Sequence, residues 1–201
     1  MRKSLCGFLL LLGLLCMCIY VGINTGAQAA GEAFATNVFN EQGFGYTIQY
    51  PDGWVYEVPD GATVVFSGPR GTKAYFSTVS IQNLFSTKKE KGKYRDIGVV
   101  VDNLIGQLKT AKNVTISIVK PFSYSKGTMK LDGRQFTAEY TLGNDRFKQL
   151  SIVIPRPKED IFHTWFYTSA LSQYNEFESI ALAMLDSWTI IESKNGGQSA
   201  N

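Results

Sequence analysis

The sequence predicts an α+β fold, and two kinds of hydrophobic periodicity predict it. From Phe44 onward, most segments alternate apolar and polar residues, which is the period of strands covered on one side. Two later segments carry apolar residues at three- and four-residue spacing, which is the period of an amphipathic helix. The order is strands, helix, strands, helix. Because it lacks the regular alternation of parallel α/β folds, we expect antiparallel strands with packed helices.

Seven segments have the composition and period of strands. The first ends at Pro51-Asp52-Gly53, a turn by its chemistry, and a loop containing Gly and Pro separates the second from the third. The last is apolar on both faces, which predicts a central strand. The segments are Tyr46–Tyr50, Val64–Ser67, Tyr75–Gln82, Val114–Phe122, Gln135–Thr141, Lys148–Ile154 and Ile161–Thr168.

Two helices are predicted, each with one apolar stripe that must pack on a sheet. The first follows Asp96, a predicted N-cap, and its apolar residues run from Ile97 to Ala111. The second carries its apolar stripe from Phe177 to Trp188. Asn175 and Glu178 have the spacing of a capping box there, although a start one turn earlier stays open.

The N-terminus has the pattern of a signal peptide. Arg2 and Lys3 precede a charge-free run from Leu5 to Val21, and Ala27-Gln28-Ala29 provides a small-residue cleavage site before Ala30. We therefore expect an extracytoplasmic protein, periplasmic or secreted. The alternative is an uncleaved membrane anchor, since about 17 apolar residues could just cross about 30 Å of hydrocarbon.

The predicted domain organisation follows from this cleavage site. Residues 1–29 form the signal peptide, 30–42 and 192–201 form flexible tails, and 43–191 form a single domain. The three cysteines, Cys6, Cys16 and Cys18, lie in the signal peptide. The mature domain therefore has no disulfide and no thiolate ligand, and its core alone must stabilise it.

Charge excludes nucleic-acid binding and marks one local feature. Loss of Arg2 and Lys3 from the 20 Lys and Arg residues leaves 18, against 17 Asp and Glu, so the mature chain is almost neutral. One segment between a strand and a helix is basic: Lys88, Lys89, Lys91, Lys93 and Arg95. It is either a solvated loop or a contact for an anionic membrane surface or a protein partner. We expect a monomer.

Residues for catalysis or metal binding are scarce. His163 is the only histidine, so a cluster of His and Cys ligands cannot form in the mature chain. It shares a predicted strand face with Trp165 and Tyr167, which indicates a hydrogen-bonded sheet residue. No G-x-S-x-G elbow and no Gly-rich phosphate loop occurs. We predict no catalytic residue, no metal site and no cofactor.

The stretch GFGYTIQYPDGWVYEV, from Gly43 to Val58, resembles the opening of the PsbP family of extrinsic photosystem subunits and their bacterial relatives. The resemblance extends over most of Gly43 to Ile191. It includes the VSIQN segment before the first helix and the Ser187–Ile191 strand after the last one. It implies an αβα sandwich with a central antiparallel sheet of about six to seven strands and helices on its faces.

The same fold occurs in Ran-binding Mog proteins and in DcrB-like envelope lipoproteins, so the resemblance implies a fold without fixing an activity. None of the metal-contact residues of plant PsbP proteins aligns with this chain, so none is carried over. We interpret the chain as a non-enzymatic, exported binding or assembly module with an unknown partner. The alternative is a small envelope hydrolase or a carrier of an apolar ligand.

Overall fold

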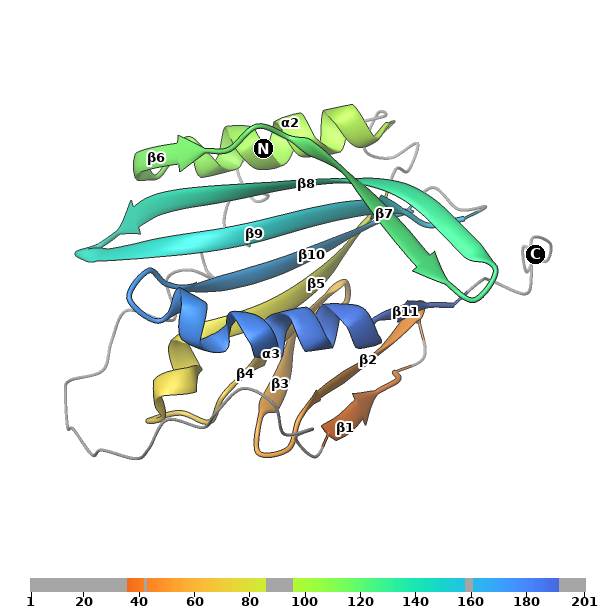
Figure 1. Ribbon diagram of the computed structural model, residues 1–201, viewed down its shortest axis with the longest axis horizontal. Helices are drawn as coiled ribbons and strands as arrows, with labels where there is room; N and C mark the ends of the chain where they lie inside the picture. The colour runs from red at the N-terminus through yellow and green to blue at the C-terminus, as the bar shows by residue number, and fades with distance from the viewer. Residues whose placement is uncertain (1–35, 42, 86–95, 158–160, 192–201) are drawn as a thin grey trace.

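The computed structural model describes residues 36–41, 43–85, 96–157 and 161–191 (Figure 1). This part of the chain contains two α-helices, α2 (Ile97–Leu108) and α3 (Tyr174–Ser187), and a short 3-10 helix, η1 (Lys73–Phe76). The strands are β1 (Thr36–Phe39), β2 (Tyr46–Pro51), β3 (Val55–Asp60), β4 (Thr63–Ser67), β5 (Ser77–Phe85), β6 (Lys112–Ile116), β7 (Lys120–Lys126), β8 (Met129–Leu142), β9 (Asp145–Pro155), β10 (Ile161–Ala170) and β11 (Thr189–Ile190).

The strands form two antiparallel sheets. The large sheet has eight strands in the order β3-β4-β5-β10-β9-β8-β6, and β7 also pairs with β8. The small sheet has the order β1-β2-β11. The α+β prediction is confirmed, with one more strand in the main sheet than the upper end of the predicted range. The apolar segment at Ile161–Thr168 is central as predicted, because β10 lies between β5 and β9.

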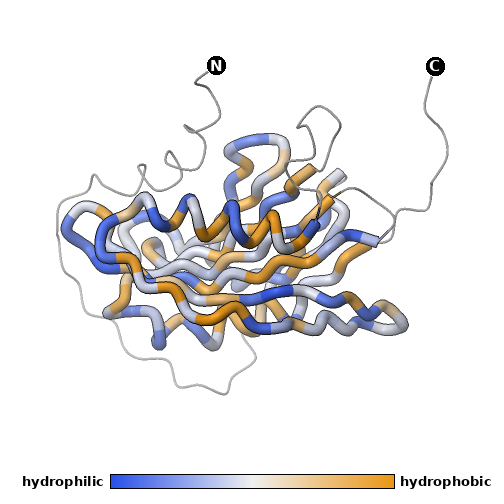
Figure 2. The backbone as a smooth tube through the Cα atoms, turned by 90° about the horizontal axis from the view of Figure 1, so that it is seen from above, coloured by the Kyte–Doolittle hydropathy of each residue, from blue (hydrophilic) through white to orange (hydrophobic). Residues whose placement is uncertain are grey.

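Two hydrophobic cores lie on opposite faces of the large sheet. One contains Trp165 and Trp188 together with Met184 of α3. The other contains Phe136 of β8 together with Leu104 of α2. Helix α3 and the small sheet therefore cover one face and α2 covers part of the other, which confirms the αβα sandwich (Figure 1). Figure 2 shows apolar residues concentrated along the strands and polar residues at several of the turns.

Local signals explain how the helices begin. The Asp96 carboxylate accepts a hydrogen bond from the Val99 N–H at 2.9 Å, so the predicted N-cap is confirmed. Helix α3 begins at Tyr174 after Gln173, so the predicted capping box at Asn175 and Glu178 is wrong. Neither helix of the described residues is long and apolar enough to cross a membrane.

One predicted tail and two predicted strands are corrected by the structure. The predicted tail of residues 30–42 includes β1, whose Phe39 is buried in the core, so folded structure begins by Thr36 and not at Gly43. The predicted strand Val114–Phe122 is two strands, since β6 and β7 pair with different parts of the long β8. Tyr75 and Phe76 belong to η1, and β5 begins only at Ser77.

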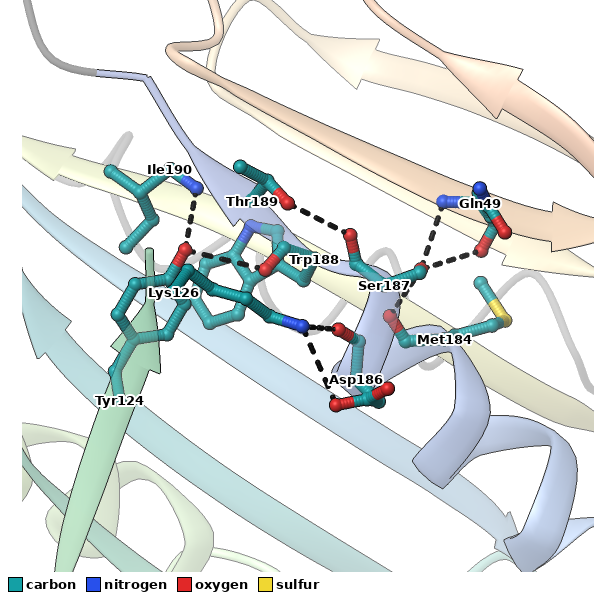
Figure 3. Close-up of polar contacts among 9 residues, drawn as sticks. All are labelled: Gln49, Tyr124, Lys126, Met184, Asp186, Ser187, Trp188, Thr189 and Ile190. Atoms are coloured by element: carbon teal, nitrogen blue, oxygen red, sulfur yellow. Dashed lines mark hydrogen bonds and ion pairs between the residues drawn. The ribbon is translucent and has the colours of Figure 1, made fainter. Parts of the chain in front are cut away.

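Strand β7 holds the segment that follows α3 in place. The Tyr124 hydroxyl accepts a hydrogen bond from the Ile190 N–H at 2.8 Å, and Lys126 contacts both the backbone carbonyl and the carboxylate of Asp186 (Figure 3). These contacts hold β11 beside β2, where Thr189 lies opposite Thr47. A strand after the last helix is confirmed as β11, but it spans only Thr189–Ile190, and the predicted first residue, Ser187, ends α3.

Candidate functional site

The basic segment predicted as a contact site lies outside the described residues. Lys88, Lys89, Lys91, Lys93 and Arg95 all fall within residues 86–95. The described chain reaches this segment at Phe85, the last residue of β5, and resumes at Asp96 before α2. Phe85 is exposed.

His163 is fully buried in the core between α3 and the large sheet. Its Nδ1 lies 2.6 Å from Asn83 Oδ1, and the Asn83 amide donates to the Phe44 carbonyl at 3.0 Å. The rings of Tyr46 and Trp188 stand edge-on to it, with centroids 5.7 Å and 5.9 Å away. The prediction of a hydrogen-bonded sheet residue is therefore confirmed.

The surroundings of His163 prevent acid–base chemistry near neutral pH. Burial, together with the positive charge of Arg156, lowers the pKa of His163 to about 3. A general base or acid works best when its pKa lies near the operating pH, and it must reach the substrate. His163 meets neither condition, because its side chain has no exposed surface.

The described residues contain neither an activated serine at the end of α3 nor a cluster of metal ligands. Ser187 lies beside Lys126 and Asp186 at the end of α3, but its hydroxyl accepts from the Gln49 N–H at 2.9 Å and donates to the Met184 carbonyl at 2.7 Å (Figure 3). The Ser187 hydroxyl therefore forms hydrogen bonds with backbone groups, and none of its hydrogen-bond partners among the described residues is a general base. Within the described ranges, no group of three or more His, Cys, Asp or Glu side chains is placed to bind a metal ion.

Among the described elements, a helix covers the α2 side of the large sheet at one end only. Helix α2 packs over β8 and β9, and Figure 1 shows it beside β6 and β8, far from β3 and β4. Phe166 of β10 belongs to the α2-side core, and Ser80 of β5 lies directly opposite it in the sheet. Since opposite residues of paired strands point to the same face, Ser80 and its neighbours form an open continuation of this face.

The strand register identifies the residues of this continuation, which we call the open face. It has two rows that cross β3, β4 and β5, and one further residue, Gln82, that follows the second row on β5. The open face consists of Val55, Glu57, Val65, Ser67, Thr78, Ser80 and Gln82.

The open face is polar, almost uncharged and accessible. Thr78, Ser80 and Gln82 alternate along β5 and are half-buried, as are Val65 and Ser67 of β4. Hydroxyl and amide groups at this exposure can exchange hydrogen bonds with water for hydrogen bonds with a partner. Hydrolysis needs a nucleophile with a base beside it, and the open face contains no such pair.

Strand β3 forms the outer boundary of the open face. In the part of the chain that the structure describes, it pairs with β4 alone, and all six of its residues are exposed, including Val55 at 46% and Val58 at 40%. We call residues 55–60, together with Glu41, the β3 edge, because Glu41 accepts a hydrogen bond from the Tyr56 hydroxyl at 2.8 Å. An exposed apolar edge strand is a typical site of protein association.

Sequence reasoning missed both surfaces. Val55–Asp60 has no clear alternation and contains Pro59, so no strand was predicted there. The alternation of Thr78, Ser80 and Gln82 was visible, but the sequence does not say how far along the sheet a helix reaches. The sequence contains one signal for an acidic surface in this region, since no Lys or Arg occurs between Lys3 and Arg70.

No protein-family model matches the chain, and no curated protein matches its sequence. Several solved structures are similar to it. Cyanobacterial PsbP from Synechocystis gives a TM-score of 0.52 at 13% identity, over 82% of this chain and 98% of that one. The Ran-binding protein Mog1p of Saccharomyces cerevisiae gives 0.52 at 12% identity, over 80% and 97%.

A Pseudomonas aeruginosa protein of unknown function gives a TM-score of 0.51 at 12% identity, over 80% of this chain and 99% of that one. At identities this low, the structural similarity establishes a common fold but not a common function. The aromatic strand and the Tyr-Pro-x-Gly-Trp turn after Gly43 had implied the same fold. The chain therefore has the PsbP/Mog-type fold.

Proposed function

We propose that this chain is an exported binding module without enzymatic activity, and that its partner is a protein held on the open face and the β3 edge. The observation that carries the proposal is the half-covered sheet: α2 packs over β8 and β9, and the same face continues across β5, β4 and β3. A surface of this kind combines half-buried polar side chains with exposed apolar ones. That combination is typical of protein–protein interfaces.

Two further observations support binding over catalysis. His163 is buried with a pKa lowered to about 3, and the Ser187 hydroxyl is engaged with the backbone, so neither supports the alternative of a small hydrolase. One protein of the same fold, yeast Mog1p, is a Ran-binding protein by name. Its likeness to this chain is in fold alone, so it supports a protein partner as a class and identifies none.

Blocking the open face tests this function. Ser67→Arg combined with Ser80→Arg places two long charged side chains on neighbouring strands of the open face. We expect this variant to lose at least about tenfold in affinity for the partner that co-purifies with the wild type, because bulky charge breaks the fit of an interface centre. Ser123→Arg combined with Ser125→Arg on exposed positions of β7 is the matched control and should bind normally.

A second variant separates the open face from the basic segment. Replacing Lys88, Lys89, Lys91 and Lys93 by Gln removes the charge of the other predicted contact site. If this variant loses the partner while Ser67→Arg/Ser80→Arg retains it, the basic segment is the contact and the proposal for the open face is wrong. Calorimetry or biolayer interferometry with both variants decides between the two sites.

Export is the second part of the proposed function. The charge-free run from Leu5 to Val21 and the small residues Ala27 and Ala29 support cleavage before Ala30. N-terminal sequencing of the protein from the cell envelope or the culture medium should therefore begin at Ala30 or within a residue or two of it. Material in the envelope that still begins at Met1 would support the membrane anchor instead.

A further inference from the structure

The β3 edge combines exposed apolar side chains with negative charge. Val55 and Val58 are exposed, and Glu57 lies between them with its side chain in solvent. Asp60 ends the strand, where its carboxylate accepts hydrogen bonds from the Ala62 N–H and the Thr63 hydroxyl. Apolar and acidic groups therefore lie on both sides of this exposed strand: Val55 and Glu57 are on the open face, and Tyr56 with its partner Glu41 is on the α3 side.

Positive charge is missing from the whole surrounding stretch of sequence. No Lys or Arg occurs between Lys3 and Arg70. In residues 36–41 and 43–69 the charged side chains are all carboxylates, and none of them forms an ion pair with a described Lys or Arg. These carboxylates belong to Glu41, Asp52, Glu57 and Asp60.

This concentration is unusual for the chain, which is almost neutral after loss of its first 29 residues. Elsewhere in the described residues, three acidic side chains, Glu139, Glu176 and Asp186, form ion pairs with basic ones, and basic residues are interspersed with the acidic ones along the chain. Like charges without counter-charges raise the local negative potential and attract cationic groups during association.

We propose that the partner contributes a cationic segment, in which Lys or Arg residues accompany apolar side chains, and that this segment lies along the β3 edge. The inference rests on the proposed function, because it names the chemistry of the partner for the same surface. The apolar side chains of the segment cover Val55 and Val58, and its cations approach Glu41, Glu57 and Asp60.

The geometry of β3 shows how such a segment is held. A bulge between Glu57 and Asp60 interrupts the pairing of β3 with β4, and Pro59 offers no N–H on this strand. A long backbone ladder along the outer edge is therefore not available. Side-chain contacts, apolar and ionic, supply most of the binding.

The same charges argue against an anionic membrane at this surface. Phospholipid headgroups of negative charge attract Lys and Arg, and they repel carboxylates. Four carboxylates that form no ion pair with a described Lys or Arg disfavour such a membrane at this surface. A polypeptide with positive charge is the occupant that the surface fits.

Two labelled peptides test the inference on the purified protein. The probe is a short fluorescein-labelled peptide of alternating Val and Lys, and its control alternates Val and Glu. We expect the cationic peptide to bind in fluorescence anisotropy and the acidic one not to bind. Binding should weaken as salt rises, because the screening length falls from about 10 Å at 0.1 M to about 3 Å at 1 M.

Isosteric variants locate the contact. Glu41→Gln combined with Glu57→Gln removes two charges and keeps the shape of the surface, including an acceptor for the Tyr56 hydroxyl. Exposed ion pairs contribute about 0.2–1 kcal/mol each, so affinity for the cationic peptide should fall about two- to thirtyfold. Asp132→Asn combined with Asp145→Asn removes two exposed charges on β8 and β9, and it should leave binding unchanged.

Each other outcome contradicts the inference in a distinct way. Equal binding of both peptides, or equal loss in both double variants, would show that the β3 edge does not select cations. If Ser67→Arg/Ser80→Arg still abolishes binding of the natural partner in that case, the proposed function stands and only the partner chemistry is wrong. Self-association of the wild type that Glu41→Gln/Glu57→Gln abolishes would assign the occupant to a second copy of this chain.

Discussion

Lowering the pH from 7 to 4 is expected to destabilise the folded protein by about 3 kcal/mol through His163 alone. Burial lowers the pKa of His163 from 6.5 to about 3 in the folded state, whereas the unfolded chain keeps the ordinary value. Between these two values the unfolded state binds the proton and the folded state does not. The stabilisation is therefore complete above about pH 6.5, and it falls by about 1.4 kcal/mol per pH unit toward pH 3.

The hydrogen bonds of His163 specify which nitrogen carries the proton in the neutral ring. The Asn83 amide nitrogen donates to the Phe44 carbonyl, so Asn83 presents its oxygen to His163 Nδ1 at 2.6 Å. An oxygen there accepts, so Nδ1 must carry the proton and Nε2 must carry the lone pair. NMR of the ring should show this tautomer, unchanged from pH 7 to pH 5.

Urea unfolding at several pH values checks the acid effect. His163→Gln should be less stable than the wild type at pH 7, because it loses ring contacts with Tyr46 and Trp188. Its stability should nevertheless fall less steeply between pH 6.5 and pH 3, since the titrating group is gone. Parallel pH profiles for the two proteins would mean that other groups cause the acid loss.

Gly133→Ala is expected to cost about 1–3 kcal/mol of folding free energy, as overpacking of a well-packed site does. Gly133 lies within β8, opposite Phe122 of β7. A Cβ at this position would stand 2.6 Å from the backbone oxygen of Val153 on β9. A backbone atom inside a sheet cannot move aside as a flexible side chain can, so the strands themselves must shift.

The matched control is the same substitution at Gly106. This residue lies on the exposed side of α2, and a Cβ there meets no atom within 4 Å. Ala is preferred over Gly in a helix by roughly 0.5–1 kcal/mol, so Gly106→Ala should raise the melting temperature. Opposite signs for the two variants in thermal unfolding support the close packing of β8 on β9. Equal effects would contradict it.

Sequence reasoning succeeded where the signal was local. Asp96 caps α2 through its own neighbour Val99, and the apolar faces of Ile161–Thr168 are a property of that segment alone. The environment of His163 was predicted only as a hydrogen-bonded sheet position. Its partner Asn83 lies on another strand, and periodicity within one strand cannot reveal such a pairing.

The candidate site could not be predicted because it depends on which strands of the large sheet helix α2 covers. Ser80 has the alternation of a sheet residue, but its exposure depends on α2 reaching only β8 and β9. The alternation of apolar and polar residues is weak in β3 because all its residues are exposed at an edge of the sheet. Such a strand does not need an apolar face to pack against a core. The charge asymmetry was present in the sequence, but the folded chain was needed to place those carboxylates beside an open surface.

Hydroxyl-radical footprinting of the protein with and without its co-purifying partner tests the proposed binding surface most directly. Val55 on the β3 edge is 46% exposed and Leu182 on α3 is 45% exposed, so the two aliphatic side chains start from the same accessibility. We expect the partner to protect Val55, Tyr56 and Val58 from oxidation and to leave the oxidation of Leu182 unchanged. Protection of Leu182 with full oxidation of the β3 edge would place the partner on the opposite face and contradict the account.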